Sequence, residues 1–393
     1  MSEPTLREVV ETLAPLERRA GSAAEAQAAE WIGDRLAAAG APARVERVKF
    51  RNGYAGLLLP LGLGATTASA IALTGRGRAL AAAAGTFAAV ATADDVDNRS
   101  RFWRRLVARP RETTNVVAEI GDLAAERTLV VLAHHDAAPT GWIFDQSFQR
   151  WLARRFPKLV ERATSSLPLW WPTIAAPALQ AIGALTGRRR ILATGIAMGA
   201  TNIAIGANIA RSPVVPGAND NLSAVAALVG LAERLRDRPI EGLRVVLASC
   251  GAEEVLQGGI YDFVDRHLRP LDKERTWILN LDTVGSPRLL MIEGEGVLKI
   301  EDYPDPAFRD LIADTAAAAG VPLLRGQRAR SSTDSVIPAR AGYPIATIVS
   351  IEPDTKLLSN YHLPSDTPEN LDYGTVAEAV ELADAVARRL AAG

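Results

Sequence analysis

Cysteine is almost absent from this sequence of 393 residues, in which Cys250 is the single example. No disulfide can therefore form within the chain, which fits a reducing compartment. Cys250 ends an apolar run, so we expect it to pack in the core rather than to react. An excess of charge of one sign is lacking too: the formal net charge is −1, and nothing in this balance indicates nucleic acid as a partner. Histidine is scarce, and a histidine-based metal site must draw on His134, His135, His267 and His362.

A cleavable signal peptide is not predicted, because residues 1–8 lack the basic-then-apolar pattern of one. Charge is missing from four apolar runs, and the sequence Gly-Arg-Gly-Arg or Gly-Arg-Arg-Arg separates the two runs of each pair. The runs are 55–74 and 79–93, then 167–186 and 191–210. Three of them approach the ~20 residues that cross a bilayer. Their many Gly and Ala residues are typical of closely packed membrane helices. We therefore predict two hydrophobic helical hairpins, each with a basic tip.

The residues are consistent with two environments for these hairpins. They cross a membrane, through residues 54–93 and 167–210, or they pack on protein, in a soluble domain or across the interface of a homo-oligomer. An even number of spans keeps the remaining segments on one side, which we expect to be the cytoplasm. The alternative is a soluble cytoplasmic protein. Arginines at both ends of the runs make the positive-inside rule indecisive.

Outside these runs, strand patterns alternate with helix patterns, which favours an α/β sheet with a largely parallel centre. Residues 1–48 look helical, with Ser22 and Glu25 as a capping box and Gly40 as a stop. Residues 222–236 predict a further, amphipathic helix. Buried strands are predicted at 128–133, 243–248, 277–281 and 345–349. Ligands of such sheets bind beyond the carboxyl ends of the strands.

Histidines and carboxylates follow most of these strands, and each of them taken alone has an ordinary explanation. His134-His135-Asp136 and Asp282 each follow a strand, and Glu253-Glu254 comes after the break at Gly251. Asp220 precedes a helix, where Asp is a common cap. His362 lies in a loop near the C-terminus. Asp136, two residues after His134, is placed to accept the second ring N–H of that histidine and so to orient it.

Taken together, these residues match the needs of a metal centre. Two histidines and three carboxylates suit two Zn²⁺ ions that share one carboxylate and one hydroxide. The three carboxylates and the hydroxide then carry four negative charges, which balance the four positive charges of the two ions. One acid, Glu253, is left over to take a proton from the water.

In their order along the chain, these motifs resemble the M28 family of zinc metallopeptidases, the co-catalytic aminopeptidases. The matching pieces are Ala133-His134-His135-Asp136, Gly217-Ala218-Asn219-Asp220-Asn221, Ala252-Glu253-Glu254, Asn280-Leu281-Asp282 and Tyr361-His362-Leu363-Pro364-Ser365-Asp366. The resemblance implies a three-layer α/β sandwich of the phosphorylase/hydrolase-like type with a mixed, centrally parallel sheet. It extends over residues 15–50, 113–145 and 214–390.

The resemblance also implies a role for each matching residue. His134 and Asp282 would bind one zinc ion, Glu254 and His362 the other, and Asp220 would bridge the two. Glu253 would be the general base and Asp136 would orient His134. The peptide bond at Asp220-Asn221 is often cis in the family. The segment Ser332-Thr333-Asp334-Ser335 lacks a histidine that many members have there.

The predicted function is hydrolysis of N-terminal peptide bonds, with a peptide as substrate and two zinc ions per chain. A carboxypeptidase, a glutaminyl cyclase-like transferase and a non-catalytic receptor or scaffold module are the alternatives. Tyr343 is a candidate for substrate contact. The predicted domains are a peptidase-like unit (1–53, 94–160 and 211–393) and two inserted hairpins (54–93 and 161–210).

Overall fold

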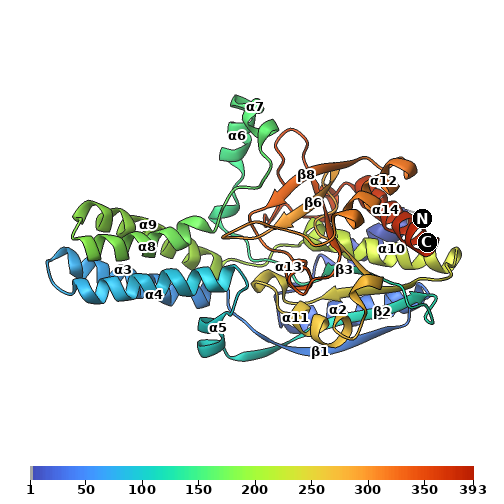
Figure 1. Ribbon diagram of the computed structural model, residues 1–393, viewed down its shortest axis with the longest axis horizontal. Helices are drawn as coiled ribbons and strands as arrows, with labels where there is room; N and C mark the ends of the chain where they lie inside the picture. The colour runs from blue at the N-terminus through green and yellow to red at the C-terminus, as the bar shows by residue number, and fades with distance from the viewer. Residues whose placement is uncertain (1–2) are drawn as a thin grey trace.

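A nine-stranded mixed sheet forms the centre of the larger part of the molecule in the computed structural model, which describes residues 3–393 (Figure 1). The strand order is β1-β2-β4-β3-β5-β9-β6-β7, and β8 also pairs with β6. The strands are β1 (Ala43–Arg51), β2 (Pro110–Gly121), β3 (Thr128–His134), β4 (Arg244–Cys250), β5 (Thr276–Leu281), β6 (Arg288–Glu295), β7 (Glu301–Asp302), β8 (Leu323–Ala329) and β9 (Ile345–Ile351). The four central strands β4, β3, β5 and β9 run parallel. Towards the edges, β1 is antiparallel to β2, β2 to β4 and β6 to β9, whereas β8 is parallel to β6.

Helices cover both faces of this sheet and make three layers. One face packs against α1 (Glu3–Leu13), α2 (Ala23–Ala38), α10 (Ser223–Asp237), α12 (Pro306–Ala319) and α14 (Tyr373–Ala391). The other face packs against α11 (Gly259–Phe263) and the turns that follow it, together with α13 (Val336–Arg340). Alternate residues of β3 divide between the two layers, since Leu129 and Val131 join the first core, and Val130 and Leu132 the second. The predicted α/β sandwich with a parallel centre is confirmed.

The predicted strands are confirmed at all four positions, each longer by one or two residues in total. The prediction of helix throughout residues 1–48 is wrong at its end, because Ala43–Arg51 pairs with β2 as an edge strand. The capping box at Ser22 forms in half: the Glu25 amide donates to Ser22 Oγ at 3.0 Å, but the Glu25 carboxylate accepts from the Gly21 amide and the Thr113 hydroxyl.

The four apolar runs form helices α3 (Ala55–Leu73), α4 (Arg78–Val96), α8 (Trp171–Thr186) and α9 (Arg189–Arg211). These are the two expected hairpins, and they pack side by side in one four-helix bundle that projects from the sheet body (Figure 1). Three of the helices, α3, α4 and α9, have the length and composition to cross a membrane. α8, with 16 residues, is shorter.

The interior of the bundle consists mainly of small residues, and large apolar side chains lie on its outside. Gly183 faces the backbone of α9, where a Cβ atom would meet the Leu192 nitrogen at 2.4 Å. Side chains such as Leu80 (62 % exposed) and Leu185 (69 %) point outward. A water-soluble bundle buries its large apolar side chains, so this arrangement is the reverse of the soluble pattern and resembles that of membrane helices.

Arginines at the far tip of the bundle close the ends of its helices. Arg78 Nε donates to the carbonyl of Ala184 at 2.9 Å, and Arg189 donates to the carbonyl of Leu73 at 3.0 Å. Each bond joins one hairpin to the C-terminal end of a helix of the other, where carbonyl groups lack helical partners. The basic tips therefore have a structural role in holding the two hairpins together.

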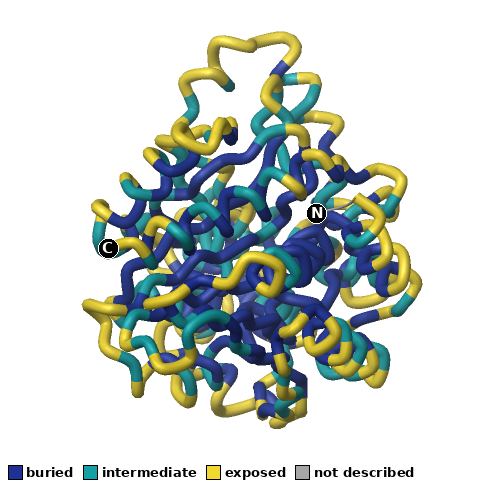
Figure 2. The backbone as a smooth tube through the Cα atoms, turned by 90° about the vertical axis from the view of Figure 1, so that its right-hand side faces the viewer, coloured by how far each residue is buried: buried dark blue, intermediate teal, exposed yellow. Residues whose placement is uncertain are grey.

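Three short helices surround the base of the bundle. α5 (Phe102–Val107) lies on one side, and α6 (Ser147–Arg155) with α7 (Pro157–Arg162) extends from the other as a protruding arm (Figure 1). Figure 2, turned by 90°, shows the same arm beyond the outline of the sheet body and coloured as exposed chain.

Candidate metal centre

The residues singled out by the sequence meet at the carboxyl ends of the parallel strands. His134 is the last residue of β3, Asp282 follows β5, and Glu253 and Glu254 open a one-turn helix after β4. Asp220 lies in the turn before α10, and His362 comes from the loop between β9 and α14. The parallel arrangement brings these segments to one edge of the sheet.

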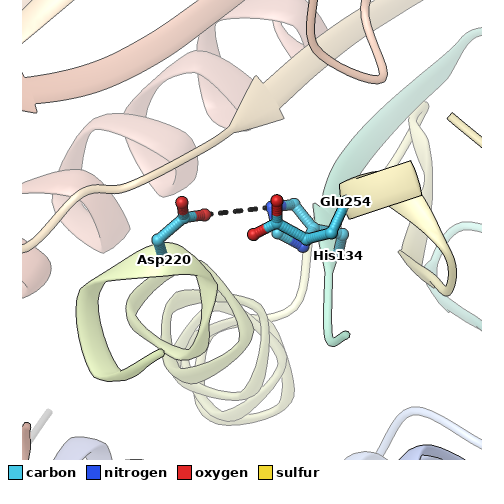
Figure 3. Close-up of side chains that lie close together, drawn as sticks. All are labelled: His134, Asp220 and Glu254. Carbon is cyan, nitrogen blue, oxygen red and sulfur yellow. Dashed lines mark ion pairs between the residues drawn. The ribbon is translucent and has the colours of Figure 1, made fainter. Parts of the chain in front are cut away.

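Asp220 lies between the two histidines and offers one carboxylate oxygen to each. Its Oδ1 is 3.2 Å from His134 Nε2, and its Oδ2 is 3.1 Å from His362 Nε2. His362 Nε2 is also 3.2 Å from Glu254 Oε2. Figure 3 shows Asp220, His134 and Glu254 converging from separate elements. The Asp220-Asn221 peptide bond is cis, as the family resemblance implies.

Several of these side chains are buried without a hydrogen-bond partner. His362 Nε2 forms no hydrogen bond although two carboxylate oxygens lie within 3.2 Å, and His134 Nδ1 and Glu254 Oε1 are unpaired as well. Four ligands held at about 2.0 Å from a tetrahedral zinc ion stand about 3.3 Å apart. The separations of 3.1 to 3.2 Å match that spacing, and nitrogen and oxygen donors are those that zinc accepts. The residues therefore fit a divalent metal.

Glu253 and Asp282 complete the acidic surroundings of this cluster. The side chain of Asp282 accepts a hydrogen bond from the Thr283 hydroxyl at 2.8 Å. Burial raises the pKa of Asp282, and the charge of the nearby His134 opposes this rise. Burial also raises the pKa of Glu253 well above the usual range of a glutamate. A carboxylate that exchanges protons near neutral pH needs a raised pKa of this kind.

Asp136 lies beside His134, but the expected hydrogen bond between them is not formed. The distance from His134 Nδ1 to Asp136 Oδ1 is 3.6 Å, which exceeds a hydrogen bond. Asp136 accepts instead from the backbone amides of Glu253, at 2.9 Å, and Glu254, at 3.1 Å. Its contact with the turn that carries both glutamates could not be foreseen from the spacing of His134 and Asp136.

Comparison with known proteins places this geometry in a family. The family model for peptidase family M28 matches residues 200–387. Residues 200–387 therefore match the M28 peptidases, in agreement with the resemblance of the motifs. No curated protein sequence matched.

Solved structures of M28-type enzymes share the fold at low sequence identity. The chain is similar to a zinc aminopeptidase from Bacillus subtilis (15 % identity, TM-score 0.58), which it matches over 98 % of its own length and 94 % of that chain. An aminopeptidase from Aneurinibacillus sp. strain AM-1 is similar at 15 % identity and a TM-score of 0.54, over 98 % and 93 % of the two chains. A glutaminyl cyclase from Bacteroides thetaiotaomicron is similar at 13 % identity and a TM-score of 0.59, over 98 % and 97 %.

Two buried charged residues support the cluster from behind, and neither was assigned a role from the sequence. Asp366 accepts from the backbone amides of Asn219, at 2.7 Å, and Asp220, at 3.1 Å, and so holds the turn that presents Asp220. Arg18 is fully buried and donates to backbone carbonyls on both sides of the cluster. Its acceptors are Leu13, Leu16, His135, Pro216 and Gly217. No local pattern around Arg18 signals this role.

A hydrogen-bonded chain links Glu253 to the base of the bundle. Gln257 Nε2 donates to Glu253 Oε1 at 2.8 Å, and the Asn98 side chain, just after α4, donates to Gln257 Oε1 at 2.6 Å. Both Asn98 and Gln257 are buried. The segment that follows α4 is therefore linked through Gln257 to the acid that stands next to the metal cluster.

Aromatic side chains cover the cluster on the side of the bundle. The His362 ring stacks on Tyr361, with centroids 3.9 Å apart, and lies 4.4 Å from the ring of Phe144. Tyr54, at the start of α3, packs against the same apolar cluster as Phe144 and Tyr361. Tyr343 is not part of this wall: it is buried in the second core, where its hydroxyl donates to the Leu268 carbonyl.

Asp334 is the remaining acid near the cluster. Both of its carboxylate oxygens are buried without a partner, and burial raises its pKa to about 8. It belongs to the segment that lacks the family's histidine. From the sequence we noted only that this segment lacks a histidine, and we assigned no role to the carboxylate of Asp334.

Proposed function

We propose that the protein is a membrane-anchored zinc exopeptidase that removes N-terminal residues from peptides. The observation that carries the proposal is Asp220, with one oxygen near each of two histidines: its Oδ1 lies near His134 Nε2 and its Oδ2 near His362 Nε2, which has no hydrogen bond. Such a carboxylate suits a bridge between two metal ions, with His134 and Asp282 on one side and Glu254 and His362 on the other.

Bound zinc lowers the pKa of water and polarises a carbonyl group. The chain's own residues would divide the remaining work. Glu253, which binds no metal ion in this proposal, would accept a proton from the attacking water and return it to the leaving amine. Gln257 would hold Glu253 Oε1 in place, and Asp136 would fix the turn on which Glu253 and Glu254 lie.

The test combines metal content with turnover of the full-length protein on a panel of peptides. We expect two zinc ions per chain and hydrolysis of peptides with a free N-terminus. Glu253→Gln should retain both ions and lose about 10²- to 10⁴-fold in kcat, which is what proton transfer of this kind contributes. Glu241→Gln, an exposed position outside the cluster, is the matched control. Near-normal hydrolysis by Glu253→Gln would refute the assignment of the base.

Glutaminyl cyclase activity is the second candidate, because solved glutaminyl cyclases are among the proteins of similar fold. Such an enzyme would release ammonia from peptides that begin with glutamine and leave a blocked N-terminus. The same peptide panel separates the two reactions, and a preference for N-terminally blocked peptides would indicate a carboxypeptidase instead. A protein that binds no metal and turns over none of these peptides would be a non-catalytic module.

The proposal of membrane anchoring rests on the four-helix bundle. Its outward-facing apolar side chains, its small-residue interior and its uncharged helical spans suit a bilayer. We propose that residues 54–93 and 161–210 are insertions into a peptidase unit formed by 1–53, 94–160 and 211–393. The peptidase unit would then lie on the cytoplasmic side. Recovery of the full-length protein in the soluble fraction without detergent would refute this anchoring.

A further inference from the structure

The protruding arm formed by α6 and α7 (residues 147–162) has an apolar face that the protein leaves uncovered. Phe148 is 66 % exposed, Trp151 54 %, Phe156 46 % and Leu159 59 %. Phe148 stacks on Trp151 with ring centroids 5.8 Å apart, and Trp151 lies edge-on to Phe156 at 6.4 Å. The three rings therefore form one aromatic cluster, and such a contiguous exposed patch marks an interaction surface.

The arm is firmly attached to the sheet body at its base, so its exposed cluster is not the result of a loose chain. Arg150 makes two contacts with the Glu352 carboxylate, at 2.6 and 2.7 Å. The Lys356 ammonium donates to the carbonyls of Glu161 and Ala163, and the Arg328 amide donates to the Thr164 carbonyl. These bonds fix the direction of the arm and leave its aromatic face outward.

Basic side chains surround this aromatic cluster. The exposed ones are Arg154, Arg155, Lys158 and Arg162. Within residues 3–393, none of these four forms an ion pair with a carboxylate, although Arg155 lies over the Phe156 ring. Asp145 and Glu161 are the nearest acids along the chain. Aromatic side chains among unpaired cations are the composition of helices that lie in the interface of an anionic membrane.

The position of the arm fits the same conclusion. It extends roughly perpendicular to the bundle, from the level at which the bundle leaves the sheet body (Figure 1). α5 lies at the same level on the other side, with Leu106 76 % exposed and Arg105 also exposed. If the bundle crosses a bilayer, the surface of that bilayer runs along the arm and α5.

We propose that the arm lies in the headgroup region of an anionic bilayer, with Phe148, Trp151, Phe156 and Leu159 inserted and the four cations facing lipid phosphates. This rests on the proposed membrane anchoring and adds a second contact of different chemistry. The arm and the bundle would fix the sheet body at two points, which sets its tilt on the membrane. The aromatic wall of the metal centre would then face the membrane surface.

Spin labels on single cysteines in the full-length protein test this proposal in lipid nanodiscs. Cys250 is buried, so a new exposed cysteine should carry the label. Leu159→Cys reports on the arm, Leu80→Cys on the bundle, and Leu123→Cys, 61 % exposed in the turn after β2, is the matched control. We expect oxygen to reach the labels at positions 159 and 80, and a water-soluble nickel complex to reach only the label at position 123.

The three labels separate failure of this proposal from failure of the anchoring on which it rests. Protection at position 80 with full nickel access at position 159 would overturn the arm proposal alone. Nickel access at both positions would overturn the anchoring. Protection at position 159 that depends on protein concentration, with spin–spin broadening, would show a contact between two copies and would also overturn the lipid proposal.

The charge of the lipid gives an independent readout. Each basic residue near an anionic surface favours its occupation by about fivefold. Arg154→Gln, Arg155→Gln, Lys158→Gln and Arg162→Gln should therefore each lower the protected fraction at position 159 in anionic nanodiscs, and neutral phosphatidylcholine should lower it in the unaltered arm. Equal protection in both lipids would contradict the role of the cations.

Discussion

Asp220 illustrates what a single residue shows in the sequence and in the structure. In the sequence it is an aspartate before a helix, which ordinarily caps that helix. In the structure its two oxygens approach His134 and His362, and the amide of its own residue is held by Asp366. The joint pattern of strand ends and acids pointed to the cluster. The supporting contacts of Asp366 and Arg18 required the folded chain, because their partners are backbone groups distant in sequence.

Gln257 provides a prediction at this scale. Gln257→Met keeps the side-chain length and removes the N–H that restrains Glu253 Oε1. We expect kcat on free-amine peptides to fall about tenfold, the size of one hydrogen bond to a charged group. KM and zinc content should stay unchanged, since Gln257 contacts no proposed metal ligand in the structure. Steady-state kinetics and metal analysis measure these quantities.

Two variants control for general damage to the fold in this experiment. Gln27→Met lies on the exposed side of α2 and should leave kcat unchanged. Asn98→Ala removes the donor to Gln257 Oε1 and should give a smaller loss than Gln257→Met, because Gln257 retains its bond to the Ser332 carbonyl. If kcat of Gln257→Met equals that of the unaltered protein, Gln257 does not position Glu253.

At the scale of helices and strands, the hydrophobic pattern predicted most elements but not their partners. Uninterrupted apolar runs gave β3, β5 and β9, and uncharged runs of about 20 residues gave the bundle helices. Ala43–Arg51 was missed because its alternation is that of an edge strand rich in charge, with Arg44, Glu46 and Arg47 partly exposed. Nothing in either hairpin indicated that the two would pack against each other, since that depends on contacts 100 residues apart in sequence.

The close packing of α8 on α9 gives a prediction for the bundle. Gly183→Ala places a Cβ atom 2.4 Å from the Leu192 nitrogen and 2.6 Å from its Cα, both backbone atoms that cannot move aside. We expect the helices to separate, at a cost of about 1–3 kcal/mol for overpacking. The unfolding midpoint of the full-length protein in detergent should fall accordingly. Gly64→Ala on α3 is the matched control, because no atom from outside its own helix lies within 4 Å of its new Cβ.

An unaltered or raised midpoint in Gly64→Ala agrees with the helix-stabilising effect of replacing glycine by alanine, up to about 1 kcal/mol. The two variants make the same chemical change in helices of the same bundle. Their difference therefore reports on the contact between α8 and α9 alone. Equal midpoints in the two variants would show that the bundle is not packed through Gly183.

For the whole molecule, the distribution of arginines favours one orientation in a membrane. The tip of the bundle is basic: Arg78 and Arg189 there are engaged with helix-end carbonyls of the opposite hairpin, whereas Arg76, Arg188 and Arg190 are exposed. At the base, the four unpaired cations of the arm join the exposed Arg105 and Arg109. We infer that this larger number of basic residues at the base would place that side in the cytoplasm by the positive-inside rule. The sequence alone did not decide the orientation, because it does not show which arginines are hydrogen-bonded to helix-end carbonyls and which are free.

A cysteine at each end of the long axis tests this orientation in intact cells. Arg76→Cys lies at the bundle tip, where the native side chain is exposed, and Leu123→Cys lies on the sheet body. A membrane-impermeant maleimide should label position 76 from outside and reach position 123 only after permeabilisation, while the unaltered protein stays unlabelled because Cys250 is buried. Labelling of position 123 alone in intact cells would reverse the orientation and put the peptidase unit outside. Labelling of neither position before permeabilisation would mean that the bundle does not cross the bilayer, and its apolar surface would then have to be covered in another way.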